Sequence, residues 1–255
     1  MEAATDLAYY EYLLIFGSGV IAGFINVVAG GGSLLTLPIL IFLGLPPATA
    51  NGTNRVGIFL QNVFAVGGFK SKGVSAFPFS IWLSISALVG AIIGAKIAVD
   101  ISGELFNRIL AIVMVMVIGI TVANPLKKNN SGHELMSRGR QALSVFAFFF
   151  VGIYGGFIQA GVGFIIIASL TLINNISLVK TNSIKVFVAL IYTIFALGVF
   201  AWEGQVDWVL GITLAAGTSI GGWSASRWSV DKGDRWIRYF LIVTVLIMAV
   251  KLWFF

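Results

Sequence analysis

The sequence predicts an all-α polytopic membrane protein built from two related halves. Hydrophobic residues make up 58% of the 255 residues and charged residues only 10%, whereas a soluble domain carries about a quarter charged residues. Long apolar runs follow one another along the chain, and about 20 apolar residues cross a bilayer as a helix. Glycine-rich motifs recur in both halves in the same order. Too little chain is left outside the runs for a separate catalytic domain.

Eight long and two short apolar runs predict eight to ten membrane segments. In chain order, the long runs are Tyr9–Val28, Asn51–Phe69, Phe77–Val99, Glu104–Ala123, Gln141–Ile158, Leu178–Trp202, Val206–Arg227 and Arg235–Phe255. The short runs, Leu34–Leu45 and Phe164–Ile173, each follow the first long run of a half. A 12-residue helix rises only about 18 Å, against a hydrocarbon core of about 30 Å. We expect each short run to pair with the long run before it, either as a broken helix that crosses twice or as a hairpin.

Basic residues gather in three loops, which predicts the orientation. The clusters are Lys70–Lys72, Lys127–Arg140 and Arg227–Arg238, whereas the N-terminal segment and the Glu203–Asp207 loop are acidic. Cytoplasmic loops are enriched in Lys and Arg. We therefore expect a multi-pass protein of the cytoplasmic membrane of a prokaryote, with its N-terminus outside. The net charge of +6 then belongs to these loops and does not indicate a nucleic-acid partner.

An internal repeat relates the two halves. Gly23–Asn26 matches Gly156–Gln159, and Gly90–Gly94 matches Gly217–Gly221. With one constant offset, Gly30, Gly32, Asn51 and Gly73 recur as Gly161, Gly163, Asn182 and Gly204. An odd number of crossings per half, or one hairpin plus three spans, inverts the second copy.

Inverted repeats with interrupted helices are the architecture of secondary transporters, with the site near the midplane between copies. Each repeat is expected to hold one broken-helix or hairpin pair plus three transmembrane helices. We assign residues 1–123 to the first repeat, 124–140 to a cytoplasmic linker loop and 141–255 to the second repeat.

Two motifs resemble those of the TauE/SafE sulfite exporter-like family. They are the AGGGSLLTLP sequence of Ala29–Pro38 and the GLPPATANGTNR sequence of Gly44–Arg55, followed by a weaker second copy. The likeness covers nearly the whole chain and implies a polytopic permease for sulfite, sulfoacetate or related sulfur-containing anions. The second copy departs from the pattern, with Phe164 in place of Ser33.

The glycine clusters predict an anion site. Gly30, Gly31 and Gly32 can turn their N–H groups toward one point, and helix N-termini near Ser33 and Phe164 would add positive dipole ends. Asn26 and Gln159 precede the clusters and can donate amide hydrogen bonds. The alternative is that the glycines only allow close helix packing. The predicted substrate-binding residues are Asn26, Gly30, Gly31, Gly32, Ser33, Asn51, Thr53, Asn54, Arg55, Gln159, Gly161, Gly163, Asn182 and Lys185.

Polar residues lie at the start of the long run that follows each short run. Ionisable groups within membrane segments are functional candidates, and Arg55 would attract an oxyanion with its planar fork while Lys185 acts as a point charge. In the alternative, both side chains extend to the interface, and Thr53 and Asn54 cap the start of their helix.

Several kinds of chemistry are missing from the apolar runs. No Asp or Glu lies well inside a run, the chain has no cysteine, and its one histidine is His133 in the central loop. This leaves no carboxylate proton relay, nucleophile–base pair or zinc site within the membrane.

Together with the resemblance, the sequence predicts a secondary carrier that exports or exchanges a small sulfur-containing anion by alternating access. The alternative is an anion channel, or a permease for another small organic anion. We expect no enzymatic activity, no cofactor and no metal. The expected partners are the anion and membrane lipids, and a homodimer is compatible with the sequence. The identity of the anion, the direction of transport and the coupling ion stay open.

Overall fold

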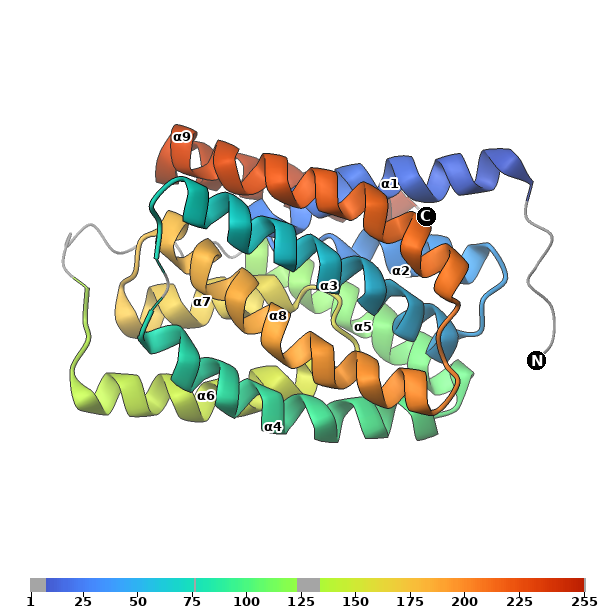
Figure 1. Ribbon diagram of the computed structural model, residues 1–255, viewed down its shortest axis with the longest axis horizontal. Coiled ribbons are helices and arrows are strands. Elements are labelled where there is room, and N and C mark those ends of the chain that lie inside the picture. The colour runs from blue at the N-terminus through green and yellow to red at the C-terminus, as the bar shows by residue number, and fades with distance from the viewer. Residues whose placement is uncertain (1–7, 76, 123–133, 255) are drawn as a thin grey trace.

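The computed structural model describes residues 8–75, 77–122 and 134–254, and all regular structure within these ranges is helical (Figure 1). The helices are α1 (Tyr9–Val28), α2 (Ser33–Phe42), α3 (Pro47–Ser71), α4 (Phe79–Asp100), α5 (Gly103–Val122), α6 (Arg138–Phe157), α7 (Val162–Asn174), α8 (Leu178–Trp202) and α9 (Trp208–Phe254). Four of them, α1, α4, α6 and α8, are long and apolar enough to cross a membrane. The prediction of an all-helical membrane protein is confirmed.

The predicted apolar runs agree closely with the observed helices, except at α3 and α9. The runs at Tyr9–Val28 and Leu178–Trp202 coincide with α1 and α8. Helix α3 begins at Pro47, earlier than the predicted Asn51, because proline is favoured in the first turn and the polar residues behind it are helical and buried. The last two predicted runs join in α9, where the chain leaves the helical conformation at Gly233. Ala123 and Phe255 lie outside the described residues.

The long helices form two groups, each drawn from both halves of the chain. In one, α9 packs against α1 and α3; in the other, α4 packs against α6 and α8. We call these the α1–α3–α9 group and the α4–α6–α8 group. They meet where α3 packs on α8. The first helix of each half therefore contacts the other half.

Glycines allow the helices of each group to cross closely. A Cβ on Gly90 or Gly94 would lie 2.1 or 2.0 Å from a backbone oxygen of α6. On the other side, a Cβ on Gly217 or Gly221 would lie 2.2 or 2.1 Å from a backbone oxygen of α1. Only glycine permits backbones to approach so closely. These repeat-related glycines thus pack helices together.

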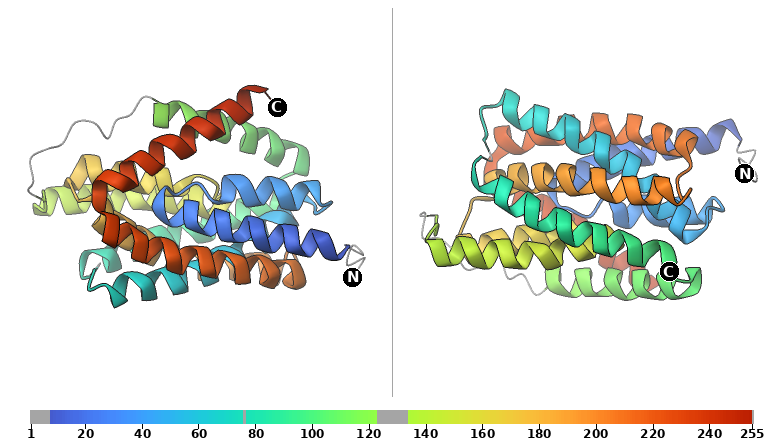
Figure 2. Two further views of the ribbon diagram at one scale, coloured as in Figure 1. Left: turned by 90° about the horizontal axis from the view of Figure 1, so that it is seen from above. Right: turned by 60° about the horizontal axis from the view of Figure 1, so that its bottom comes forward.

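Helices α1 and α6 begin at opposite ends of the bundle and stop in its interior (Figures 1 and 2). The short helices α2 and α7 continue from them after four non-helical residues each. The interior of the bundle therefore contains two helix C-termini and two helix N-termini, which is where polar side chains were predicted to gather.

Candidate functional site

The two helix breaks are made by residues with left-handed backbone. Gly30 has φ of 90°, and Gln159 and Gly161 have φ of 66° and 74°. Glycine adopts this conformation readily, whereas it is uncommon for a residue with a side chain. Helix α2 begins at Ser33, as predicted, and α7 begins at Val162. Each break places a helix C-terminus beside the N-terminus of the next helix.

The first break touches the first turn of α7, just beyond the second break, through Gly30 and Gly163. A Cβ on Gly30 would lie 2.4 Å from Cα of Gly163, and a Cβ on Gly163 would lie 2.2 Å from Cα of Gly30. No side chain fits at either position. Gly31 faces the ring of Phe164 and Gly32 faces the backbone of α1. The glycine clusters therefore lie together, and their members are tightly packed.

Arg55 and Asn51 of α3 hold the C-terminal end of α6. The Arg55 guanidinium donates from Nη1 to the Gly155 carbonyl (3.1 Å) and from Nη2 to the Gly156 carbonyl (2.5 Å). Asn51 Nδ2 donates to the Phe157 carbonyl (2.7 Å). Arg55 is fully buried, so the alternative in which it extends to the interface is wrong.

Lys185 and Asn182 of α8 hold the C-terminal end of α1 in the same way. Lys185 Nζ donates to the carbonyls of Asn26 (3.0 Å) and Val27 (2.7 Å) and to Asn182 Oδ1 (2.8 Å). Asn182 Nδ2 donates to the Val28 carbonyl (3.1 Å). The last carbonyls of a helix lack partners within it and attract cations. Each half thus supplies the cation that satisfies the broken helix of the other half.

These hydrogen bonds match the halves differently from the sequence motifs. By these bonds Asn26 corresponds to Gly155 and Gly30 to Gln159. The glycine crossings instead pair Gly23 with Gly156, as the motif match has it, so the two kinds of contact differ by one helical turn. The offset changes along the chain because α7 has 13 residues and α2 has 10, while three residues follow α7 and four follow α2. The constant offset of the glycines does not reveal this shift.

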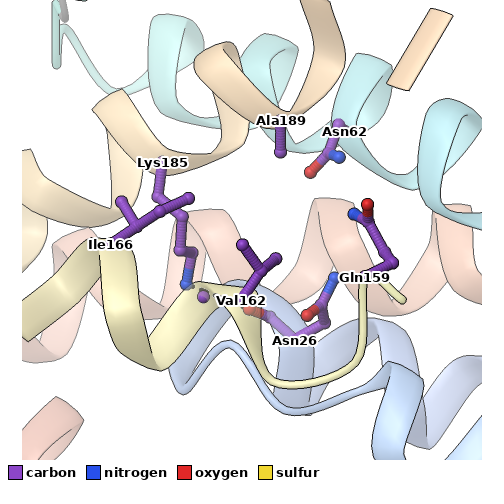
Figure 3. A pocket seen from close by; sticks show the side chains of 8 residues that line it. Asn26, Asn62, Gln159, Val162, Ile166, Lys185 and Ala189 are labelled. Carbon is purple, nitrogen blue, oxygen red and sulfur yellow. Dashed lines mark hydrogen bonds between the residues drawn. The ribbon is translucent and has the colours of Figure 1, made fainter. Parts of the chain in front are cut away.

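A pocket lies at the boundary between the two helix groups (Figure 3). Side chains of Asn26, Asn62 and Lys185 reach it from α1, α3 and α8, and that of Gln159 reaches it from the second break. Its free volume holds about one water molecule. The full lining is Asn26, Asn62, Gln159, Val162, Gly163, Ile166, Lys185 and Ala189.

Amide groups dominate the polar lining. Asn26 Nδ2 donates to Gln61 Oε1 (3.1 Å), and Gln61 Nε2 donates to Asn62 Oδ1 (3.4 Å). Asn62 Nδ2 is buried and has no hydrogen-bond partner among the described residues. A buried donor without a partner costs about 1–3 kcal/mol, which a ligand in the pocket would recover.

The surroundings of the pocket are positively charged. Among the residues whose burial is described, the buried charged side chains are Arg55 and Lys185, with no buried Asp or Glu. Arg55 Nη1 lies 3.4 Å from Oε1 of the pocket residue Gln159. The guanidinium also stacks over the Phe200 ring, 4.7 Å from its centroid. The amide groups of the pocket lining therefore lie close to two buried cations.

Other predicted site residues lie outside the pocket lining. Thr53 Oγ1 accepts a hydrogen bond from the Asp207 N–H (2.9 Å), and Asn54 Oδ1 accepts one from Thr36 Oγ1 (2.6 Å). Both lie well inside α3, so the alternative in which they cap its start is wrong. The predicted residues that do not line the pocket are Gly30, Gly31, Gly32, Ser33, Asn51, Thr53, Asn54, Arg55, Gly161 and Asn182.

The predicted set of substrate-binding residues did not include four lining residues. Asn62 is a side-chain amide about two turns beyond Arg55 in the sequence, and this is the signal that could have found it. Val162, Ile166 and Ala189 are apolar and have no local signal that distinguishes them from other residues of a membrane helix.

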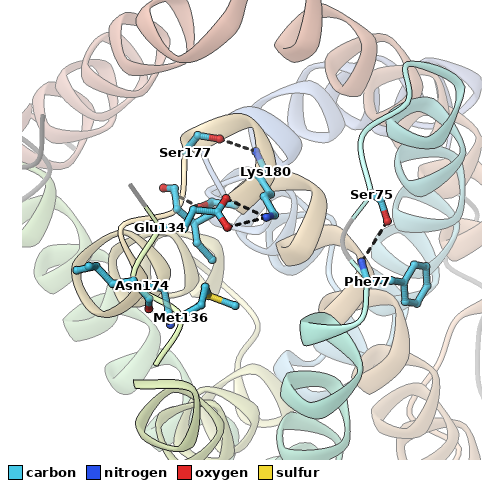
Figure 4. Close-up of polar contacts among 10 residues, drawn as sticks. Ser75, Phe77, Glu134, Met136, Asn174, Ser177 and Lys180 are labelled. Atoms are coloured by element: carbon cyan, nitrogen blue, oxygen red, sulfur yellow. Dashed lines mark hydrogen bonds and ion pairs between the residues drawn. The ribbon is translucent and has the colours of Figure 1, made fainter. Parts of the chain in front are cut away.

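A second polar cluster closes one end of the bundle, away from the pocket (Figure 4). Lys180 Nζ forms an ion pair with Glu134 (2.8 Å), and the Leu135 N–H donates to the Asn174 carbonyl (2.7 Å). Asn174 Oδ1 accepts from Ser144 Oγ (2.6 Å). Two residues of the predicted linker loop, Glu134 and Leu135, are thereby tied to the end of α7 and the start of α8.

A family model described as sulfite exporter TauE/SafE matches residues 15–252. Among curated relatives, a probable membrane transporter protein ORF9 of Sinorhizobium sp is 27% identical over 256 residues, 97% of this chain and 94% of the relative. The probable membrane transporter protein YfcA of Escherichia coli K12 is 28% identical over 258 residues, 99% and 94% of the two chains. One from Haemophilus influenzae is 25% identical over 252 residues, 97% and 96%. No match was found among solved structures.

Proposed function

This chain belongs to the sulfite exporter TauE/SafE family, and we propose that it is a secondary carrier that exports or exchanges a small sulfur-containing anion, such as sulfite or sulfoacetate, by alternating access. Membership makes it a membrane transporter, in line with the names of its relatives. The observation that carries the proposal is the contact of the first helix break with the first turn of α7, beside a pocket lined by amides and a lysine.

We propose that the two halves are inverted repeats around this pocket. The proposal is supported by the opposite entry of α1 and α6 (Figure 1) and by the reciprocal packing of α1 on α9 and of α6 on α4. The reciprocal bonds from Arg55 to α6 and from Lys185 to α1 support it as well. Transporters with this design place the substrate near the midplane of the membrane.

The pocket's position suggests how access alternates. It lies where the α1–α3–α9 group meets the α4–α6–α8 group, and it holds only about one water molecule. Because so little space is free, we propose that an anion enters after the groups separate on one side. A channel would instead need a continuous polar path, which makes it the second candidate.

The orientation follows from loop charge. We propose that the protein lies in the cytoplasmic membrane of a prokaryote with its N-terminus outside, because the basic loops are expected in the cytoplasm. Alternating access of a bound anion requires no covalent chemistry, so we propose no enzymatic role.

Transport by the purified full-length chain in proteoliposomes tests the function. We expect saturable uptake of labelled sulfite or sulfoacetate, and counterflow when unlabelled anion is inside. Asn26→Leu and Gln159→Leu should each lower uptake by about tenfold or more, because each removes an amide from the lining. Thr213→Val is the control, because the Thr213 hydroxyl donates to a carbonyl of its own helix.

Two results would change the assignment. Conductance far above the turnover of a carrier, without counterflow, would favour the channel. Unchanged uptake in both amide variants would remove these side chains from the site.

A further inference from the structure

We propose that the pocket is built for a divalent anion, whose two negative charges balance the two buried cations, Arg55 and Lys185. The inference rests on the proposed carrier function and narrows its substrate class. The ligand would be a small dianion, such as fully ionised sulfite or a sulfonate that also bears a carboxylate.

The contacts of both side chains match their charged forms. An arginine side chain stays protonated in proteins. Lys185 Nζ lies within hydrogen-bond distance of two carbonyls and an amide oxygen, which matches the three N–H groups of the ammonium form. The two side chains are 0% and 4% exposed.

No carboxylate balances them within the described residues. The ion pairs found there, at Lys72, Arg108 and Lys180, join side chains that are at least one-quarter exposed and involve neither buried cation. The helix ends do not balance them either. The C-termini of α1 and α6 each carry about −0.5 charge, and the N-termini of α2 and α7 beside them each carry about +0.5. The helix ends cancel in pairs, and a charge of about +2 remains.

A buried charge without a partner is costly. A monovalent ligand would leave one cation unbalanced, whereas a divalent ligand leaves none. The protein would thus select its ligand by charge as well as by shape.

The side chains that supply the positive charge differ from those that can contact the ligand directly. The donors of Lys185 and most of those of Arg55 are used by carbonyl and amide oxygens, so these cations attract the ligand mainly through space. Direct contact is left to the amides of Asn26, Asn62 and Gln159. Removing a cation should therefore change the preferred charge of the ligand, whereas removing an amide should weaken binding of every ligand.

Sulfoacetate and sulfoacetamide make a matched pair of probes, because they have nearly the same shape but carry two charges and one. Apparent affinities come from thermal-shift titrations of the purified chain, since a ligand that prefers the folded state raises its stability. We expect sulfoacetate to bind about tenfold or more tightly than sulfoacetamide. Arg55→Gln and Lys185→Gln should reduce this ratio, whereas Asn62→Leu should weaken both ligands and keep the ratio.

Equal affinity for the two probes, with labelled sulfite still transported, would overturn the charge balance and leave the carrier function intact. An unchanged ratio in whichever cation variant is monodisperse would overturn it too. If neither cation variant is monodisperse, the ratio of the two probe affinities in the wild-type protein decides the question. Absence of transport and of binding for every anion would instead contradict the proposed function itself.

Discussion

Arg55 and Lys185 are held inside the bundle by helix ends instead of carboxylates. Each cation binds two carbonyls at the end of a helix that begins in the other half of the chain. The hydrogen bonds to these carbonyls offset part of the cost of removing the cation from water. The same residues can therefore stabilise the fold and keep a positive potential at the pocket.

Replacing Lys185 by methionine tests the structural part of this role. The change leaves the Asn26 and Val27 carbonyls without a donor, and we expect a loss of about 3 kcal/mol in unfolding free energy. Lys180→Met on the same helix is the control, since Lys180 is part of an exposed ion pair worth about 0–1 kcal/mol. Thermal unfolding in detergent measures both. Equal losses of unfolding free energy in the two variants would mean that the bonds of Lys185 to the helix end stabilise the protein no more than an exposed ion pair does.

The broken helices depend on glycine for two separate reasons. Gly30 has a left-handed backbone and also lies against Gly163. Gly163 has the contact without the unusual φ, and Gly44 has a φ of 95° with nothing within 4 Å of a Cβ. Substitutions at these three glycines can therefore distinguish the effect of backbone strain from the effect of close packing.

Alanine substitution at these three glycines should give graded effects. We expect Gly44→Ala to cost about 1–2 kcal/mol through its backbone alone, and Gly163→Ala about 1–3 kcal/mol through overpacking. Gly30→Ala combines both and should be the most destabilising. Thermal unfolding and sulfite counterflow are the measurements. We expect Gly163→Ala to reduce transport and Gly44→Ala to preserve it. If Gly163→Ala transports normally, the contact of Gly30 with Gly163 does not control the site.

At the scale of the whole molecule, the two helix groups have different kinds of contact within and between them. Within each group, glycine-mediated crossings join α1 to α9 and α4 to α6. Between the groups lie the pocket, the reciprocal caps and the contact of α3 with α8. This division predicts that the groups move as units and that the boundary between them changes during transport.

Hydrogen exchange tests that division. Adding a transported anion should slow amide exchange at the breaks, residues 29–32 and 158–161, because the ligand joins the groups there. Exchange at the α1–α9 and α4–α6 crossings should stay the same, since both lie within a group. A uniform change over all helices would contradict movement as two units.

The helices and the position of the breaks were predictable because their causes are local. Apolar runs of membrane length define α1 and α8 to the residue, and glycine clusters mark both breaks. The polar residues after each short run were also recognisable, because a charge within an apolar segment stands out in any sequence.

The sequence by itself therefore determined an all-helical membrane chain with two interrupted helices and polar groups near them. Only the tertiary structure decided that Arg55 binds α6, that Lys185 binds α1, and that Asn62 faces the pocket. Hydropathy and backbone preference act over a few neighbouring residues, whereas these pairings join segments more than 90 residues apart and depend on how whole helices pack.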